Sequence, residues 1–227
     1  MPTDHILSAL SHALDATGLG DFPGKVLYSG LETLKPGKLL VLGLNPGGDP
    51  AAETASARSH LASAATRGPG WNEYLDVSWR PGGRLYPPGQ APMQRRVSCL
   101  LEGLGFNVRS VCASNLIFVR STGVDTLQSW KDLGRLCWPV HKAILEVVRP
   151  ECIVSLGDDV LDFIAAQSGQ ARQVESYPSG HGAWNCKHSR VDLLGRETSI
   201  ISLPHPGRYA IDHHPEVISW MRSQIEK

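Results

Sequence analysis

Three polar residues, Asn45, Asn115 and His205, interrupt apolar or tightly turned stretches of this sequence in places where they could serve chemistry. An amide offers both a hydrogen-bond donor and an acceptor, which suits it to reading the edge of a nucleobase. His205 stands between two prolines, which hold its backbone nearly rigid. Each amide also has a structural alternative: Asn45 could simply form a tight turn, and Asn115 could tie down a neighbouring loop.

The apolar segment 38–44, which precedes Asn45, predicts a buried strand. An apolar run without alternation suits a strand that is covered on both faces, as in a parallel sheet. Asn45 then lies at the carboxyl end of the strand, which is where ligands bind in open α/β sheets. The glycines that follow, Gly47 and Gly48, allow backbone N–H groups to approach a ligand without interference from a Cβ atom.

Apolar runs and helical spacings alternate along the rest of the chain, which predicts βαβ units, a parallel sheet and an α/β fold. We expect strands at 26–28, 38–44, 111–119 and 152–157, and a hairpin of 191–194 with 200–203. The spacing of apolar residues predicts helices over 6–14, 92–104, 130–148 and 160–164 and from about 214, with 51–65 helix-permissive. Pro139 should divide or kink the helix at 130–148.

The 227 residues are 41% hydrophobic, which predicts one domain over residues 1–227. Lys plus Arg and Asp plus Glu number 22 each, so the net charge neither indicates nor excludes a nucleic-acid partner. Without a long apolar segment or a signal-like amino terminus, we expect a cytoplasmic monomer that does not bind membranes. The five cysteines are widely spread, and His181, Cys186 and His188 match no tight metal-binding pattern, so we expect neither a metal nor another cofactor.

The segment 67–90 concentrates aromatic residues and arginines in a frame of Gly and Pro. Long irregular loops in compact domains are often functional. From Arg67 to Arg96 there are five arginines and two acidic residues, so this stretch could form one wall of a nucleic-acid groove, with Arg80 and Arg84 facing DNA. Alternatively, the aromatic residues anchor the loop to the body of the protein.

Four short motifs, taken in order, resemble those of the uracil-DNA glycosylase superfamily. They are Gly43-Leu44-Asn45-Pro46-Gly47 after a first strand, Asn115 within a second, Leu156-Gly157 after a third and Pro204-His205-Pro206 after a fourth. The first motif is similar to that of the mismatch-specific and single-strand-selective branches. The resemblance spans residues 38–210 and implies a three-layer α/β/α domain with a central, mainly parallel four-stranded sheet. The chain departs from the superfamily in lacking the cysteine quartet of the iron-sulfur branches and in reading His-Pro-Gly-Arg-Tyr where many members have His-Pro-Ser.

The resemblance implies that Asn45 positions a water molecule below the sugar, with Asp49 as an alternative base. His205 then donates a hydrogen bond to the base oxygen on which negative charge develops. Asn115 accepts from uracil N3–H and donates to O4, a polarity that cytosine reverses. The substrate-binding residues so implied are Gly43, Leu44, Gly47 and Asn115.

A base inside a duplex is inaccessible, so such an enzyme flips it out or takes it from single-stranded DNA. The loop after His205 is then expected to fill the gap in the stack, with Arg208 and Tyr209 contacting DNA. Alternatively, Tyr209 packs inward and Arg208 is an ordinary surface charge.

Three functions are compatible with these residues. The leading hypothesis is a DNA glycosylase that hydrolyses the N-glycosidic bond of uracil or a related damaged base in base excision repair. The second is a catalytically silent or differently specific nucleic-acid-binding protein on the same fold, and the third is a small-molecule nucleoside or nucleotide hydrolase. A P-loop is disfavoured because Gly47-Gly48 is not followed by Lys and Ser or Thr, and a serine hydrolase because no G-x-S-x-G occurs.

Overall fold

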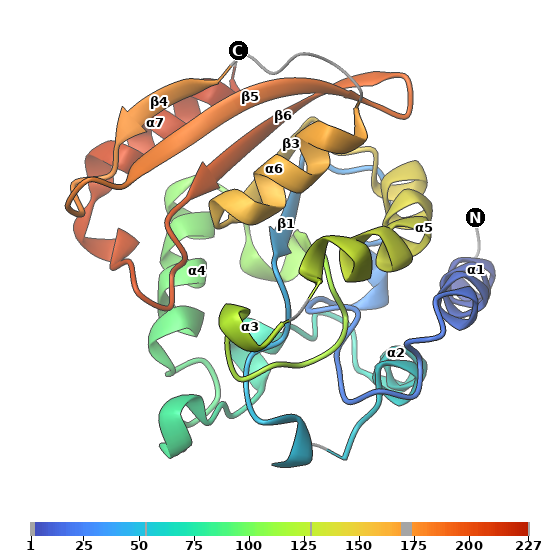
Figure 1. Ribbon diagram of the computed structural model, residues 1–227. Coiled ribbons are helices and arrows are strands. Elements are labelled where there is room, and N and C mark those ends of the chain that lie inside the picture. The colour runs from blue at the N-terminus through green and yellow to red at the C-terminus, as the bar shows by residue number, and fades with distance from the viewer. Residues whose placement is uncertain (1–2, 53, 128, 169–173, 227) are drawn as a thin grey trace.

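A computed structural model describes residues 3–52, 54–127, 129–168 and 174–226 (Figure 1). The helices are α1 (Thr3–Ala16), α2 (Ala57–Ser63), α3 (Glu73–Asp76), α4 (Pro92–Gly103), α5 (Trp130–Val148), α6 (Asp158–Gln167) and α7 (Pro215–Ile225). The strands are β1 (Leu39–Gly43), β2 (Cys112–Asn115), β3 (Cys152–Leu156), β4 (Glu175–Pro178), β5 (Asn185–Leu193) and β6 (Arg196–Leu203). Short 3-10 turns lie between several of these elements.

In the part of the chain that the structure describes, six strands form one mixed sheet in the order β2-β1-β3-β6-β5-β4. The first four run parallel, β5 pairs antiparallel with β6, and β4 pairs antiparallel with β5. The prediction of an α/β fold with a parallel sheet is therefore confirmed for four strands, and the predicted total of four is wrong. The parallel strands place their carboxyl ends at one edge, where the segments after β1, β3 and β6 begin.

Helices pack on both faces of this sheet, as the side chains of β1 show. Leu40 and Leu42 belong to a core cluster with residues of α1, α5 and α6, whereas Leu39 and Val41 belong to a second cluster with residues of α4 and α7. All five residues of β1 are buried. This burial on both faces explains why the strand is apolar without alternation.

The predicted helices α1, α4, α6 and α7 are confirmed. The predicted hairpin also forms, but its pairing differs: residues 191–193 pair with 196–198, and residues 200–202 pair with 187–189. A single helix α5 runs through Pro139. The predicted strand at 26–28 is wrong, because this segment forms only an isolated bridge between Leu27 and Ser114. The predicted strand at 111–119 ends at Asn115, after which Leu116 N–H donates to the carbonyl of Gly43, the last residue of β1, and Ile117 N–H donates to the carbonyl of Leu44.

The two strands that extend the sheet, β5 and β4, come from a polar, glycine-rich part of the sequence. β4 is an edge strand whose residues are exposed or half-buried, so its hydropathy carries no strand signal. β5 starts at Asn185 and alternates only partly between buried and exposed positions. Among the residues that the structure describes, none of the helices combines the length and the hydrophobicity that crossing a membrane requires.

Candidate functional site

Asn45 lies two residues beyond β1, in a turn that is tied to the segment following β2. Its amide nitrogen donates to Ser121 Oγ at 2.8 Å, to the Pro46 carbonyl at 3.1 Å and to the Val119 carbonyl at 3.3 Å. Gly48 N–H donates to the Ser121 carbonyl at 3.0 Å, and Gly48 has a positive φ of 116° that favours glycine. The side chain and the backbone of this turn are thus held by the same neighbouring segment.

The contacts of Asn45 also fix which way its amide points. Two of the three partners are carbonyl oxygens, which can only accept, so the nitrogen must face them. Oδ1 is consequently the atom of the half-buried side chain that remains as an acceptor toward a ligand. An acceptor fixed in this way can orient a water molecule through one of its O–H bonds.

Asn115 is the last residue of β2 and stands beside Gly43 in the parallel pairing with β1. Its side chain is buried, and its Oδ1 occupies the space that a Cβ atom on residue 43 would need. Glycine is therefore required at position 43 for this amide to hold its place. Leu44 is buried and Gly47 is exposed in the turn that carries Asn45.

Tyr28 is buried next to Asn115 in an acidic and aromatic environment. Burial, followed by the negative charge of Glu73, raises the pKa of Tyr28 well above 10, while hydrogen bonding to Asn115 acts in the opposite direction. Glu73 is itself buried, is paired with Lys25 and accepts a hydrogen bond from Trp79 Nε1 at 3.2 Å. A neutral Tyr28 hydroxyl is thus held against the Asn115 amide.

His205 lies two residues beyond the end of β6, in a loop that a residue of α4 holds by hydrogen bonding. Arg96 Nη1 of α4 donates to the Pro206 carbonyl at 2.7 Å, and the N–H groups of Arg208 and Tyr209 donate to the His205 carbonyl at 2.9 and 3.0 Å. The His205 side chain is exposed at the rim, and its Nδ1 accepts from Gly207 N–H at 3.1 Å. Although much of the residue's surface faces solvent, the side of the ring that packs against the loop loses water, and this partial burial, followed by the positive charge of Arg208, lowers the pKa of His205 from 6.5. The ring is thus neutral at pH 7, with its proton on Nε2.

A cleft of about 360 Å³ lies beside His205, at the carboxyl ends of β3 and β6. It is lined by Gly157, Asp158, Ala183, Trp184, Asn185, Lys187, Pro204 and His205. The Asp158 carboxylate pairs with Lys187 and accepts from Ser202 Oγ at 2.6 Å. The cleft thus combines an aromatic wall, a neutralised ion pair and the His205 imidazole.

Comparisons with models of known protein families and with curated protein sequences found no match.

The predicted catalytic residues share one edge of the sheet without touching each other. Asn115 and Asn45 extend neighbouring strands, and β3 separates β1 from the strand that carries His205. Adjacent strands lie about 4.8 Å apart, so the strand ends that carry Asn45 and His205 are about 10 Å apart in the sheet. Among the described residues, no hydrogen bond joins His205 to either asparagine. Asp49, the alternative base, is exposed and its Oδ1 accepts from Ala51 N–H at 2.9 Å.

The expectation that Tyr209 contacts DNA is wrong. Its ring is fully buried, its hydroxyl donates to the Ser179 carbonyl at 2.6 Å, and it stacks on His214 with a centroid distance of 5.0 Å. The inward-packing alternative is thus the observed one for Tyr209. Arg208 is exposed next to His205 and stays a candidate DNA contact.

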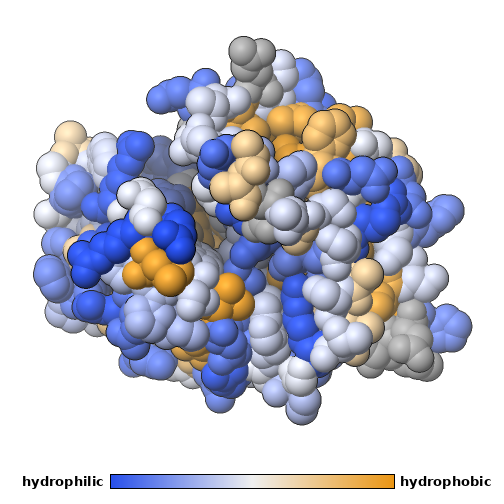
Figure 2. All heavy atoms as spheres, turned by 90° about the horizontal axis from the view of Figure 1, so that it is seen from below, coloured by the Kyte–Doolittle hydropathy of each residue, from blue (hydrophilic) through white to orange (hydrophobic). Residues whose placement is uncertain are grey.

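The segment 67–90 splits between the two roles considered for it. Tyr74 is buried and packs with Tyr28 and Trp79, so these aromatic residues anchor the loop. Arg80 and Arg84 are exposed near the bridge that joins Trp79 to Tyr86. Figure 2 shows the molecule from the side toward which the β1 and β6 arrows of Figure 1 point, with hydrophilic and hydrophobic residues intermixed around a hollow.

The side chains of the three residues that were weighed as metal ligands from the sequence do not point to a common site. Cys186 is buried, His188 faces Glu175 and Ser199, and His181 lies against Trp184. Throughout residues 3–52, 54–127, 129–168 and 174–226, no group of three His, Cys, Asp or Glu side chains could hold a metal ion.

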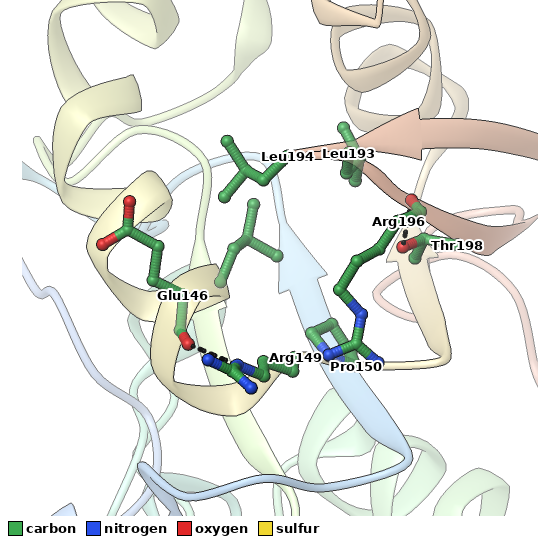
Figure 3. A pocket seen from close by; sticks show the side chains of 8 residues that line it. Glu146, Arg149, Pro150, Leu193, Leu194, Arg196 and Thr198 are labelled. Carbon is green, nitrogen blue, oxygen red and sulfur yellow. Dashed lines mark hydrogen bonds between the residues drawn. The ribbon is translucent and has the colours of Figure 1, made fainter. Parts of the chain in front are cut away.

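A second crevice, of about 200 Å³, lies at the opposite edge of the parallel strands (Figure 3). It is bordered by the end of α5, Pro150, and the turn between β5 and β6. Arg149 folds back so that its Nε donates to the Glu146 carbonyl at 3.1 Å, as the dashed line in Figure 3 shows. The crevice lies at the amino ends of β3 and β6, away from the edge at which α/β proteins bind ligands.

Sequence reasoning missed Trp184, Lys187, Asp158 and Ser121. Trp184 and Lys187 belong to a polar segment that gave no strand signal, and only the pairing of β5 with β6 brings them beside His205. Asp158 follows the Leu156-Gly157 motif directly, which is a signal that could have identified it. Ser121 gave no sequence signal, because its role comes from the meeting of two segments that are 76 residues apart.

Proposed function

We propose that this protein is a DNA glycosylase that removes uracil or a related damaged base by hydrolysing its N-glycosidic bond. The observation that carries the proposal is that a fixed hydrogen-bond acceptor, on Asn45, and a neutral hydrogen-bond donor, on His205, lie at the same carboxyl-end edge of the parallel strands. Asn45 Oδ1 is left to accept from water, and His205 Nε2–H is left to donate to a leaving base. Such a pair serves a reaction in which the sugar becomes positive while the base becomes negative.

In the proposed reaction, the bond between C1′ of the deoxyribose and the base nitrogen breaks, and both electrons leave with the base. Water oriented by Asn45 adds its oxygen to C1′, and the proton that it releases ends on the departed base. Asn45 cannot act as a strong base, so this mechanism requires the bond to break before water attacks. His205 stays protonated on Nε2 throughout and stabilises the negative oxygen of the base through its hydrogen bond.

Asn115 is the residue proposed to recognise the base. Its amide is buried at the end of β2, where it accepts from and donates to complementary groups of one pyrimidine edge. An amide held in one orientation rejects a base of opposite polarity, because a buried donor would then face a donor. The contact with Gly43 and the neutral Tyr28 hydroxyl both support such a fixed orientation.

The topology also supports this proposal. The four parallel strands carry, in the order β2-β1-β3-β6, the motifs that resemble the uracil-DNA glycosylase superfamily. Helices on both faces of the sheet are compatible with the three-layer arrangement of that superfamily. On this view, β5 and β4 are additions at one edge of its four-stranded sheet.

The test is to incubate the protein with oligonucleotides that contain uracil, hypoxanthine, xanthine or a mismatch, and to cleave abasic sites with alkali. We expect cleavage at uracil or a related base in single-stranded or duplex DNA, and cleavage by Asp49→Asn at the wild-type rate. Binding of DNA without cleavage of any of these substrates would instead support the silent binder. Release of bases from free nucleosides alone would support the small-molecule hydrolase.

Gly43→Ala is expected to lower the rate of base excision at least tenfold without unfolding the protein. The added Cβ overlaps Asn115 Oδ1, so the amide must leave the position from which it recognises the base. Gly37→Ala is the matched control, because Gly37 precedes the other end of β1 and a Cβ at that position meets only the Lys35 carbonyl oxygen, at an ordinary contact distance of 3.6 Å. Single-turnover rates of the two variants, with circular dichroism to check folding, decide the matter. Equal rates for both variants would remove Asn115 from base recognition.

A further inference from the structure

Trp184 is an exposed aromatic residue on a rigid turn. It lies between β4 and β5, and 45% of its surface is exposed. Ser179 holds the turn through its N–H and Oγ, which donate to the Trp184 carbonyl at 3.2 and 2.6 Å, and Trp184 N–H donates to the His181 carbonyl at 3.2 Å. The His181 ring supports the indole at a centroid distance of 4.9 Å. The indole is thus presented to solvent in a fixed place.

The turn that carries Trp184 is joined to the loop that carries His205. Tyr209 Oη donates to the Ser179 carbonyl at 2.6 Å, so the side chain that was expected to contact DNA instead fixes the Trp184 turn. The pairing of β5 with β6 also fixes the Trp184 turn relative to His205, because Lys187 of β5 stands opposite Ser202 of β6. The position of Trp184 relative to His205 is therefore set by the fold.

The cleft shared by Trp184 and His205 is suited to a flat, uncharged group. Asp158 and Lys187 are paired with each other, so they cancel as charges within the cleft. A volume of about 360 Å³ falls at the lower end of the range for small-ligand sites. Arg208, exposed on the loop after His205, supplies a positive charge outside this cleft.

We propose that Trp184 stacks on a nucleobase of the bound DNA strand, next to the nucleotide whose base is removed. This inference rests on the proposed glycosylase function and names the residue that holds the strand. Stacking of bases on aromatic side chains tolerates any sequence, because every base has a π-face. The neutral cleft receives the base that stacks on Trp184. Arg208, three residues after His205, is then placed to contact a phosphate next to that base.

The test measures binding separately from catalysis. Wild type, Trp184→Ala, Trp184→Phe and Phe22→Ala are titrated against a fluorescent single-stranded oligonucleotide that contains no damaged base, at one salt concentration. Phe22 is the matched control, because it is an aromatic residue that is 55% exposed and lies in the segment between α1 and α2. We expect Trp184→Ala to weaken binding about tenfold, Trp184→Phe to keep most of the affinity, and Phe22→Ala to match wild type.

Three results would overturn the inference: equal affinity of Trp184→Ala and wild type, an equal loss in Phe22→Ala, or no binding by the wild-type protein. Because the oligonucleotide cannot be cleaved, these results do not depend on glycosylase activity. A protein that binds through Trp184 but cleaves no damaged base would remove the proposed function and keep the stacking role. If the protein cleaves uracil but Trp184→Ala binds the oligonucleotide as tightly as wild type, the proposed function stands and the stacking role is removed.

Discussion

His205→Ala is expected to lower the single-turnover rate of base excision about a hundredfold or more while the protein stays folded. The neutral imidazole is proposed to donate from Nε2 to the oxygen that becomes negative as the base leaves. Deleting a donor of this kind in other enzymes costs about 3 kcal/mol of transition-state stabilisation. His205 is exposed at the rim of the cleft, so truncating its side chain leaves no cavity in the core.

The dependence of the base-excision rate on pH, measured below pH 7, provides an independent check of the role of His205. Protonation of Nδ1 removes the acceptor for Gly207 N–H, so the loop geometry depends on the neutral ring. Because the pKa of His205 is lowered from 6.5, we expect the rate to stay level through pH 6.5 and to fall only at lower pH. His213→Ala is the control, since that side chain is 77% exposed in the segment between β6 and α7 that also contains His205. An unchanged rate in folded His205→Ala would exclude the proposed role.

The positions of the parallel strands could be predicted because β1, β2 and β3 are buried throughout and β6 is buried over its second half. β1 and β3 are entirely buried, and an apolar run followed by glycine is the pattern that such burial leaves in a sequence. The position of Asn45 after β1 followed from the same pattern. What holds Asn45 did not follow, because Val119 and Ser121 reach it only after β1 and β2 pair.

The outermost strand, β4, was less predictable because its side chains are not buried. The residues of β4 are mostly exposed, so the strand is defined by hydrogen bonds to β5 rather than by burial of side chains. The orientation of Tyr209 depends on Ser179, which lies 30 residues away in sequence. Its burial could therefore not be read from the loop in which it occurs. Contacts of this kind require the fold and not only the local pattern.

The largest effect on stability is expected when the pH is lowered, because the buried ring of His60 resists protonation in the folded protein. This ring is buried on α2, and its Nδ1 accepts from Val26 N–H at 3.3 Å. Burial, followed by the positive charges of Arg67, Lys25 and Arg120, lowers the pKa of His60 from 6.5 to about 2. Protonation in the folded state would place a positive charge in a buried site that already faces three others.

The sign of the resulting pH dependence follows from proton uptake. Below pH 6.5 the unfolded chain binds a proton at His60 that the folded protein does not, so acid favours unfolding. The contribution of His60 to the free energy of unfolding is complete above pH 6.5 and falls as the pH is lowered toward about 2. At pH 4.5 the loss is about 3 kcal/mol, since each pKa unit corresponds to about 1.4 kcal/mol.

His60→Gln is therefore expected to be less stable than wild type at pH 7.5 and to lose much of that disadvantage at pH 4.5. The glutamine takes up no proton, so the difference in the free energy of unfolding between the two proteins should shift by about 3 kcal/mol. Urea denaturation at both pH values measures it, and the other titrating groups cancel because both proteins contain them. His12→Gln, at an exposed position of α1, is the control for replacing a histidine by glutamine. A constant difference for His60→Gln would mean that the folded protein accepts a proton at this site.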